Sequence, residues 1–344
     1  MTDKSKAKAA DQYVKQAAKA EKKSFFHKPD PGEAASLYQK AAEIYLKEKM
    51  YQEAKVCYER SAINFDHDGQ SLSSGSNYGL AAKAAFLKKD PKEVIRLCLQ
   101  CKIQYFEAGN GLPAVRVIKE YAQKLRDVDP ETSYQLYDNL LDIIETEEKY
   151  HWEKDSFVDF ALLCFDMKKY EECYKAWDRA KKAFVHLNNT DGASHCLLSS
   201  IVIALERNDI VKAKELYDAA IQEDYFVKTQ DYNCIDMIYR GVKNHDGDLL
   251  EIGQKNIIIG FIKPEIARII DSFKAPKSEP VEEPQGKSGK PAPVGGPSKE
   301  AQAIAAEAAQ LAENEMSGDE EKKGGEEEEG GGENKPQDDE DWLL

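Results

Sequence analysis

The sequence predicts an all-α fold, a solenoid of helix hairpins closed by a C-terminal helical cap and followed by a disordered acidic tail. Two observations predict the solenoid: a face of small and aromatic residues recurs about every 40 residues through residues 1–273, and this region shows no useful period-two alternation of the kind that marks strands. A sharp change in composition after Phe273 predicts where the helices end.

The recurring face is aligned by the start of one helix in each unit. These starts are Tyr51, Pro91, Pro130, Tyr170 and Ile210, with steps of 40, 39, 40 and 40 residues. Positions 3, 7, 10 and 14 residues after each start share one helical face. In the first unit they hold Ala54, Tyr58, Ser61 and Phe65. A small residue lets a neighbouring helix approach, and a ring fills the remaining space.

The same face appears half a period earlier, at Ala34, Tyr38, Ala41 and Tyr45, so each unit is a pair of helices. Asp-Pro pairs at 30–31, 90–91 and 129–130 place a capping acid before a proline at the first helical position. The pattern resembles the tetratricopeptide repeat, whose usual period is about 34 residues, so we expect longer helices here. The predicted architecture is a right-handed α-α superhelix.

Four segments follow from this pattern. Residues 1–273 form the helical repeat domain, and 274–297 form a linker, because Ala275–Pro297 contains six prolines. Residues 298–316 begin at a serine cap and carry only a weak apolar stripe, which predicts a transient helix. Residues 317–344 hold 12 acids against 3 lysines, a composition typical of disorder.

Charge and cysteine content exclude several classes of protein. The chain carries a net charge of −15 and its repeat region has no basic excess, which argues against a nucleic-acid partner. Seven scattered cysteines indicate a reducing compartment rather than a disulfide framework. The start of the chain has no secretory h-region, and the longest apolar runs are far shorter than a membrane span. We therefore expect a cytoplasmic protein.

No motif indicates catalysis or a cofactor. Cys98 and Cys101 form the one CxxC, but no second pair of ligands with zinc spacing accompanies them, and the repeat register already places both in the core. Histidines are dispersed, and no nucleophile elbow, Walker or dinucleotide motif occurs. We expect no metal, no cofactor and no enzymatic activity.

Phe25 and Phe26 stand between Lys22, Lys23 and Lys28 at the tip expected between the first two helices. Two adjacent rings cannot both face one core. They are either a hydrophobic staple for the second helix or a shallow membrane insertion supported by the lysines on anionic lipid.

Several segments together resemble the soluble NSF attachment proteins, and among them the gamma members, over roughly residues 10–275. These segments are the Phe25-Phe26 tip, KPDPGEAASLYQKAAEIYLKEKMYQEAKVCYERSA, DPETSYQLYDNLLDIIETEEKY and ERNDIVKAKELYDAA. The acidic end with terminal leucines and the proline-rich extension agree with this resemblance.

The resemblance implies a non-enzymatic adaptor in vesicle-mediated and intracellular protein transport. Its concave face would bind the acidic four-helix bundle of syntaxin-type SNAREs through Arg116, Lys119 and Lys154. It would recruit and stimulate the hexameric ATPase NSF, peripherally attached to endoplasmic reticulum, Golgi or endosomal membranes. Asp155 and Asp159 stand where the family tends to carry further bases, so we expect the second electrostatic contact to be weak.

The resemblance assigns the ATPase contact to the last seven residues, Asp338, Asp339, Glu340, Asp341, Trp342, Leu343 and Leu344. The acids would meet a basic surface while a leucine enters an apolar pocket. The long segment after Phe273 is a departure from the family, and it leaves open a direct contact through Glu265, Asp271 and the last helix instead.

Two other classes of function remain as alternatives. A generic tetratricopeptide-type peptide-binding scaffold would need neither the phenylalanine tip nor the terminal Trp-Leu-Leu, and would bind a short acidic peptide tightly. An enzyme would need a clustered acid, base or metal set, which zinc titration would reveal.

Overall fold

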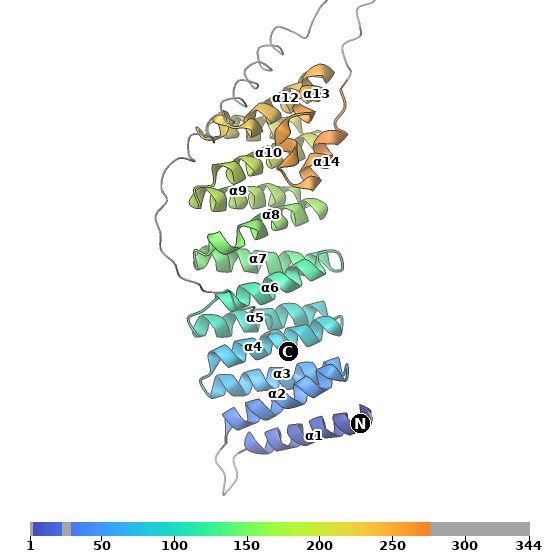
Figure 1. Ribbon diagram of the computed structural model, residues 1–344, viewed down its shortest axis with the longest axis vertical. Coiled ribbons are helices and arrows are strands. Elements are labelled where there is room, and N and C mark those ends of the chain that lie inside the picture. Colours follow the sequence, from blue (N-terminus) through green and yellow to red (C-terminus); the bar gives the residue numbers. More distant parts are fainter. Residues whose placement is uncertain (1–2, 23–28, 276–344) are drawn as a thin grey trace, which may run out of the picture.

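The computed structural model describes residues 3–22 and 29–275, and within these ranges it contains helices and no strand (Figure 1). The prediction of an all-α fold is therefore confirmed. The α-helices are α1 (Asp3–Ala20), α2 (Pro31–Lys47), α3 (Tyr51–His67), α4 (Ser71–Leu87), α5 (Pro91–Glu107), α6 (Leu112–Leu125), α7 (Pro130–Thr146), α8 (Tyr150–Asp166), α9 (Tyr170–His186), α10 (Thr190–Glu206), α11 (Ile210–Ala220), α12 (Gln230–Asn244), α13 (Gly247–Gln254) and α14 (Pro264–Ser272). Two short 3-10 helices are η1 (Phe226–Lys228) and η2 (Ile257–Gly260).

The helices run back and forth and stack along one long axis, from α1 at one end to α12, α13 and α14 at the other (Figure 1). From α1 to α11 each helix packs on the one before it and the one after it. Contacts also join α4 to α6, α5 to α7 and α10 to α12, so alternate helices lie on the same side of the stack. We call the outward surface of α2, α4, α6, α8 and α10 the even-helix face.

The period of about 40 residues comes from uniform helices and turns. From α2 to α10 every helix except α6 has 17 residues. Most turns hold three residues, with the middle one in the left-handed region; these residues are Lys49, Gly69, Lys89, Glu148, Lys168, Asn188 and Asn208. The residue after each of them donates to a carbonyl five positions back, as Met50 N does to Tyr45 O at 2.8 Å. This is the Schellman helix ending.

The junction after α6 departs from this rule. α6 has 14 residues, and residues 126–129 contain no left-handed residue before α7 begins. The carbonyl of Leu125 instead accepts from Val128 N at 3.1 Å and from Asp129 N at 2.8 Å. The stack therefore consists of two uniform runs joined at one irregular turn.

The core follows the repeat face that the sequence predicts. Positions 3 and 7 of the first unit, Ala54 and Tyr58, are buried, and so are Cys173 and Trp177 in the fourth. All five predicted starts agree with the observed first residues of α3, α5, α7, α9 and α11. The last unit breaks the pattern, because α11 ends at Ala220 and Asp224 lies beyond it.

The C-terminal helices fold back onto the stack. Ile266 and Ile270 of α14 are buried, and α14 contacts α10. Gln254 Nε2 donates to Ile270 O at 2.8 Å and to Phe273 O at 3.0 Å, which joins α13 to the end of α14. The segment between η2 and α14 thereby lies beside α8 and α10.

The tail segments stay predictions. Lys274 and Ala275 are the last described residues, so the rest of the linker (274–297), the transient helix (298–316) and the acidic tail (317–344) lie outside the described residues. Within the described ranges, no helix is both long and apolar enough to cross a bilayer.

Candidate functional site

Arg116 lies on the outward side of α6. Val115 and Ile118 on the same helix are buried, and the helical period directs Arg116 away from them. The side chain is exposed and makes no ion pair with any residue in the described part of the chain. An unpaired guanidinium on the even-helix face is free to meet an anionic partner.

Lys119 is held in a contact between helices. Its Nζ donates to Glu153 Oε2 of α8 at 2.7 Å, and Ser156 Oγ donates to the same oxygen at 3.0 Å. Glu153 has φ −133° and ψ 21°, so α8 is kinked at this residue. Lys119 therefore links α6 to α8, and much of its charge is neutralised by Glu153.

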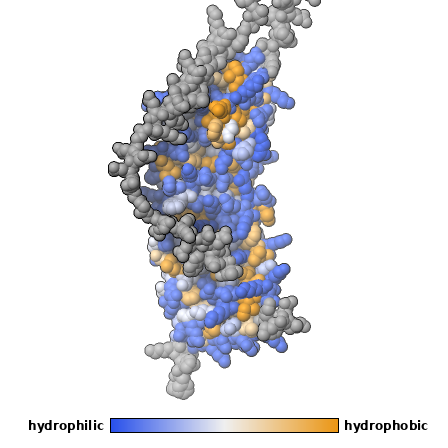
Figure 2. All heavy atoms as spheres, in the orientation of Figure 1, coloured by the Kyte–Doolittle hydropathy of each residue, from blue (hydrophilic) through white to orange (hydrophobic). Residues whose placement is uncertain are grey.

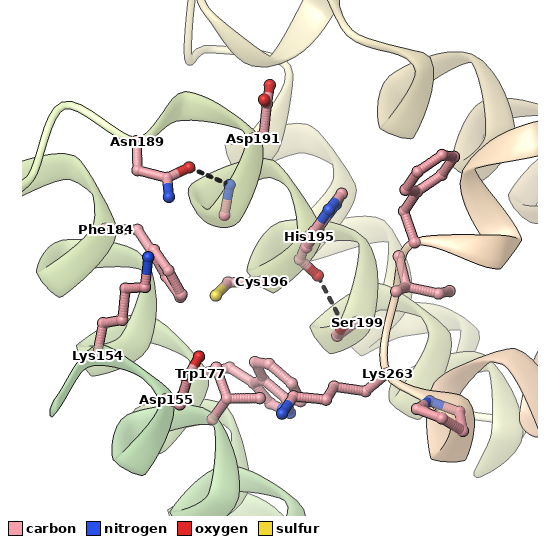
Figure 3. Close-up of a pocket in the computed structure, with 15 residues that line it drawn as sticks. Lys154, Asp155, Trp177, Phe184, Asn189, Asp191, His195, Cys196, Ser199 and Lys263 are labelled. Atoms are coloured by element: carbon pink, nitrogen blue, oxygen red, sulfur yellow. Dashed lines mark hydrogen bonds between the residues drawn. The ribbon is translucent and has the colours of Figure 1, made fainter. Parts of the chain in front are cut away.

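Lys154 lies at the rim of a cavity of about 400 Å³ on the even-helix face. The cavity is a groove between α8 and α10 whose floor is formed by Trp177 and Phe184 of α9, and segment 261–264 closes one side (Figure 3). Lys154 and Asp155 come from α8, and Lys263 comes from the closing segment, so both signs of charge reach the rim.

His195 of α10 lines the same cavity and is tied to a buried acid. Its Nδ1 lies 2.6 Å from Asp231 Oδ1 of α12, whose side chain is 3% exposed. Burial lowers the pKa of His195, but the hydrogen bond and the charge of Asp231 outweigh it and leave that pKa above its usual value. The pair favours a protonated ring whose Nε2 is a second donor.

Sequence reasoning missed His195, Trp177 and Lys263 as cavity residues. Trp177 matches the repeat register, so the sequence shows it only as core. Lys263 reaches the cavity because α14 folds back over α10, and no local pattern reveals that long-range contact. Lys154 and Asp155 carry a signal, since adjacent opposite charges follow the exposed Trp152.

The described chain offers no reactive centre. Among residues 3–22 and 29–275, no three His, Cys, Asp or Glu side chains gather as metal ligands would. All seven cysteines are buried and free. Burial raises the pKa of the Cys101 thiol to about 12, and that of the Cys57 thiol likewise to about 12, so these sulfurs stay protonated.

The predicted membrane-attachment residues are largely beyond description. Lys22 is exposed just after α1, and Pro29 and Asp30 are exposed before α2. Lys23, Phe25, Phe26 and Lys28 lie outside the described residues, as do all seven residues from Asp338 to Leu344 assigned to the ATPase contact. Their roles stay predictions.

Fold and site together define a helical-repeat protein that presents binding surfaces. The family model of the soluble NSF attachment proteins (SNAP) matches residues 8–252, and the chain belongs to this family. It is, in general terms, a SNAP-type adaptor.

Two relatives carry the name gamma-soluble NSF attachment protein. The one from Dictyostelium discoideum is 27% identical over 282 residues, covering 80% of this chain and 87% of its own length. The one from Arabidopsis thaliana is 23% identical over 219 residues, covering 64% and 75%. The solved structure of C. therm. Get4 covers 79% of this chain and 93% of its own at 15% identity and a TM-score of 0.43. The family assignment rests on the sequence matches.

Proposed function

We propose that this chain binds assembled SNARE bundles, including syntaxin-type SNAREs, and recruits and stimulates the ATPase NSF so that the bundles are taken apart. The observation that carries the proposal is the family match over residues 8–252, which spans α1 to α12 and most of α13. The chain would act without a cofactor, as a cytoplasmic adaptor peripherally attached to endoplasmic reticulum, Golgi or endosomal membranes.

The even-helix face supports the SNARE part of the proposal. A SNARE bundle is a rod with an acidic surface, so a complementary surface needs exposed bases. Arg116 is exposed and unpaired within the described residues, which makes it the leading contact. Lys154 is a second contact at the cavity rim, whereas Lys119 contributes less because it is bound to Glu153.

Reversing the charge of Arg116 tests this surface. We expect Arg116→Glu to bind purified SNARE bundle about tenfold more weakly, since about 1.4 kcal/mol corresponds to that factor. The effect is expected to shrink at high salt, because the contact is exposed. Lys175→Glu is the matched control, because Lys175 is exposed on α9, in the other set of helices. Equal weakening by both variants, or by neither, would contradict the assignment.

The ATPase part is tested by deleting the segment Asp338–Leu344. We expect ATPase stimulation and SNARE disassembly to fall while the SNARE affinity stays unchanged, because the segment lies outside the repeats. Both activities are measured in one reconstitution with purified SNARE bundle and NSF. Full stimulation by the shortened chain would transfer the contact to α14, where Glu265 and exposed Asp271 are the candidates.

A further inference from the structure

The cavity between α8 and α10 is partly built by a segment beyond the family match. The family model ends at residue 252, whereas the closing wall consists of Phe261, Ile262, Lys263 and Pro264. Ile257 and Phe261 are 70% and 69% exposed. Figure 2 shows hydrophobic residues gathered at this end of the face in view, above a largely hydrophilic surface. The cavity thus opens beside an uncovered apolar surface.

The lining combines aromatic walls with charges of both signs. Trp177 and Phe184 form an apolar floor, and Phe261 stands at one side (Figure 3). Lys154 makes no ion pair within the described residues, and Lys263 Nζ has only Asp159 Oδ1 at 3.8 Å. Asp155 and Asp191 supply acceptors on the same rim.

We infer that this cavity binds a short acidic and aromatic peptide, and that its occupant is the segment Asp338–Leu344 of the same chain. The acids of the segment would meet Lys154 and Lys263, and Trp342 or a leucine would lie against Trp177 and Phe184. Backbone N–H groups of the segment would donate to Asp155 and Asp191.

Charge and size favour a peptide over a free anion. A phosphate would be repelled by Asp155 and Asp191 and would leave the aromatic floor unused. A peptide brings donors, acids and apolar side chains together, and a cavity of about 400 Å³ has room for one or two bulky side chains. The segment DDEDWLL provides this combination of groups.

The length of the connecting chain allows the contact. Asp338 lies 63 residues after Ala275 in the sequence, and a flexible chain of this length has an end-to-end distance of roughly 40–48 Å. α14 begins at Pro264, which lines the cavity, and its nine residues span about 14 Å. The cavity is well within reach, so the effective concentration of the segment there is in the millimolar range.

Such docking would connect the two binding activities of the proposed function. The segment proposed to contact NSF would be held against the repeats, and Lys154 would be shared between it and the SNARE bundle. A bundle that engages Lys154 would then release the segment toward the ATPase. The docking itself requires neither partner.

The three tryptophans of the full chain provide a direct test. In protein labelled with 5-fluorotryptophan, Trp152 is 72% exposed and Trp177 is 2% exposed, so they give exposed and buried references for the fluorine signals. We expect the Trp342 signal to be broad and protected from a dissolved paramagnetic agent. The double variant Lys154→Glu, Lys263→Glu should lose this protection, and Lys175→Glu should keep it.

Thermal unfolding of each variant checks that the repeats stay folded, and excess unlabelled peptide 334–344 should release Trp342 in the wild-type chain. A Trp342 signal as sharp and accessible as that of the free peptide would overturn the inference, as would protection that survives the double variant. Since neither SNARE nor NSF is present, either result leaves the proposed function standing.

Discussion

Single charged residues join helices that are not consecutive in the chain. Lys55 of α3 is 8% exposed and contacts Glu93 of α5, which also accepts from Arg96 Nε at 2.9 Å. Lys119 and Glu153 join α6 to α8 in the same way. A buried ammonium without its partner is costly, so these pairs contribute to the alignment of alternate helices.

The Glu93 carboxylate makes a prediction with a defined pH dependence. Hydrogen bonds from Arg96 and Lys55 lower the pKa of Glu93 to about 2, below its usual 4.5. The carboxylate therefore stabilises the fold above pH 4.5, and this contribution is lost as the pH falls toward 2. We expect Glu93→Gln to reduce the free energy of unfolding at pH 7 by about 1–3 kcal/mol.

Urea unfolding between pH 7 and pH 3 measures this difference, which should narrow on the acid side. Glu171→Gln is the control, because Glu171 is exposed on α9 and makes no ion pair in the described ranges. A difference that stays constant with pH would show that packing, not charge, accounts for the loss.

At the scale of helices, α12 and α13 cross at a glycine. A Cβ built on Gly241 would lie 2.8 Å from Leu250 N and 2.9 Å from Leu250 Cα. These are backbone atoms, so the helices would have to move apart. We expect Gly241→Ala to destabilise the C-terminal end by about 1–3 kcal/mol, although alanine favours helix. Gly260→Ala should have little effect, because nothing lies within 4 Å of its added Cβ. Hydrogen exchange of α12 and α13 would locate the change.

Helix positions were predictable because local signals determine them. Asp30, Asp90 and Asp129 cap α2, α5 and α7 as expected, each accepting from the backbone three residues later. The seven cysteines fell in the core, as their positions in the register indicate. The cavity was not predictable, because its wall at Lys263 depends on α14 folding back over residues about 65 positions earlier. Local periodicity contains no information about that contact.

At the scale of the whole molecule, membrane attachment and SNARE binding lie on separate parts. The loop between α1 and α2 is at one end of the stack, and α14 is at the other (Figure 1). We expect Phe25→Ser with Phe26→Ser to slow SNARE disassembly on liposomes and to leave it unchanged in detergent. Two phenylalanines contribute about 3–6 kcal/mol when fully buried in lipid. An equal loss in both media would mean that the rings instead pack within the protein.

The irregular turn after α6 has a mechanical consequence. On either side of it the helices have one length and one kind of turn, so each run has a single preferred curvature. At residues 126–129 that geometry is interrupted, and neighbouring α6 is one turn shorter than the rest. A molecule that has to adjust its arc to rods of different girth would bend most easily here, which makes this junction a natural articulation between two stiff arms.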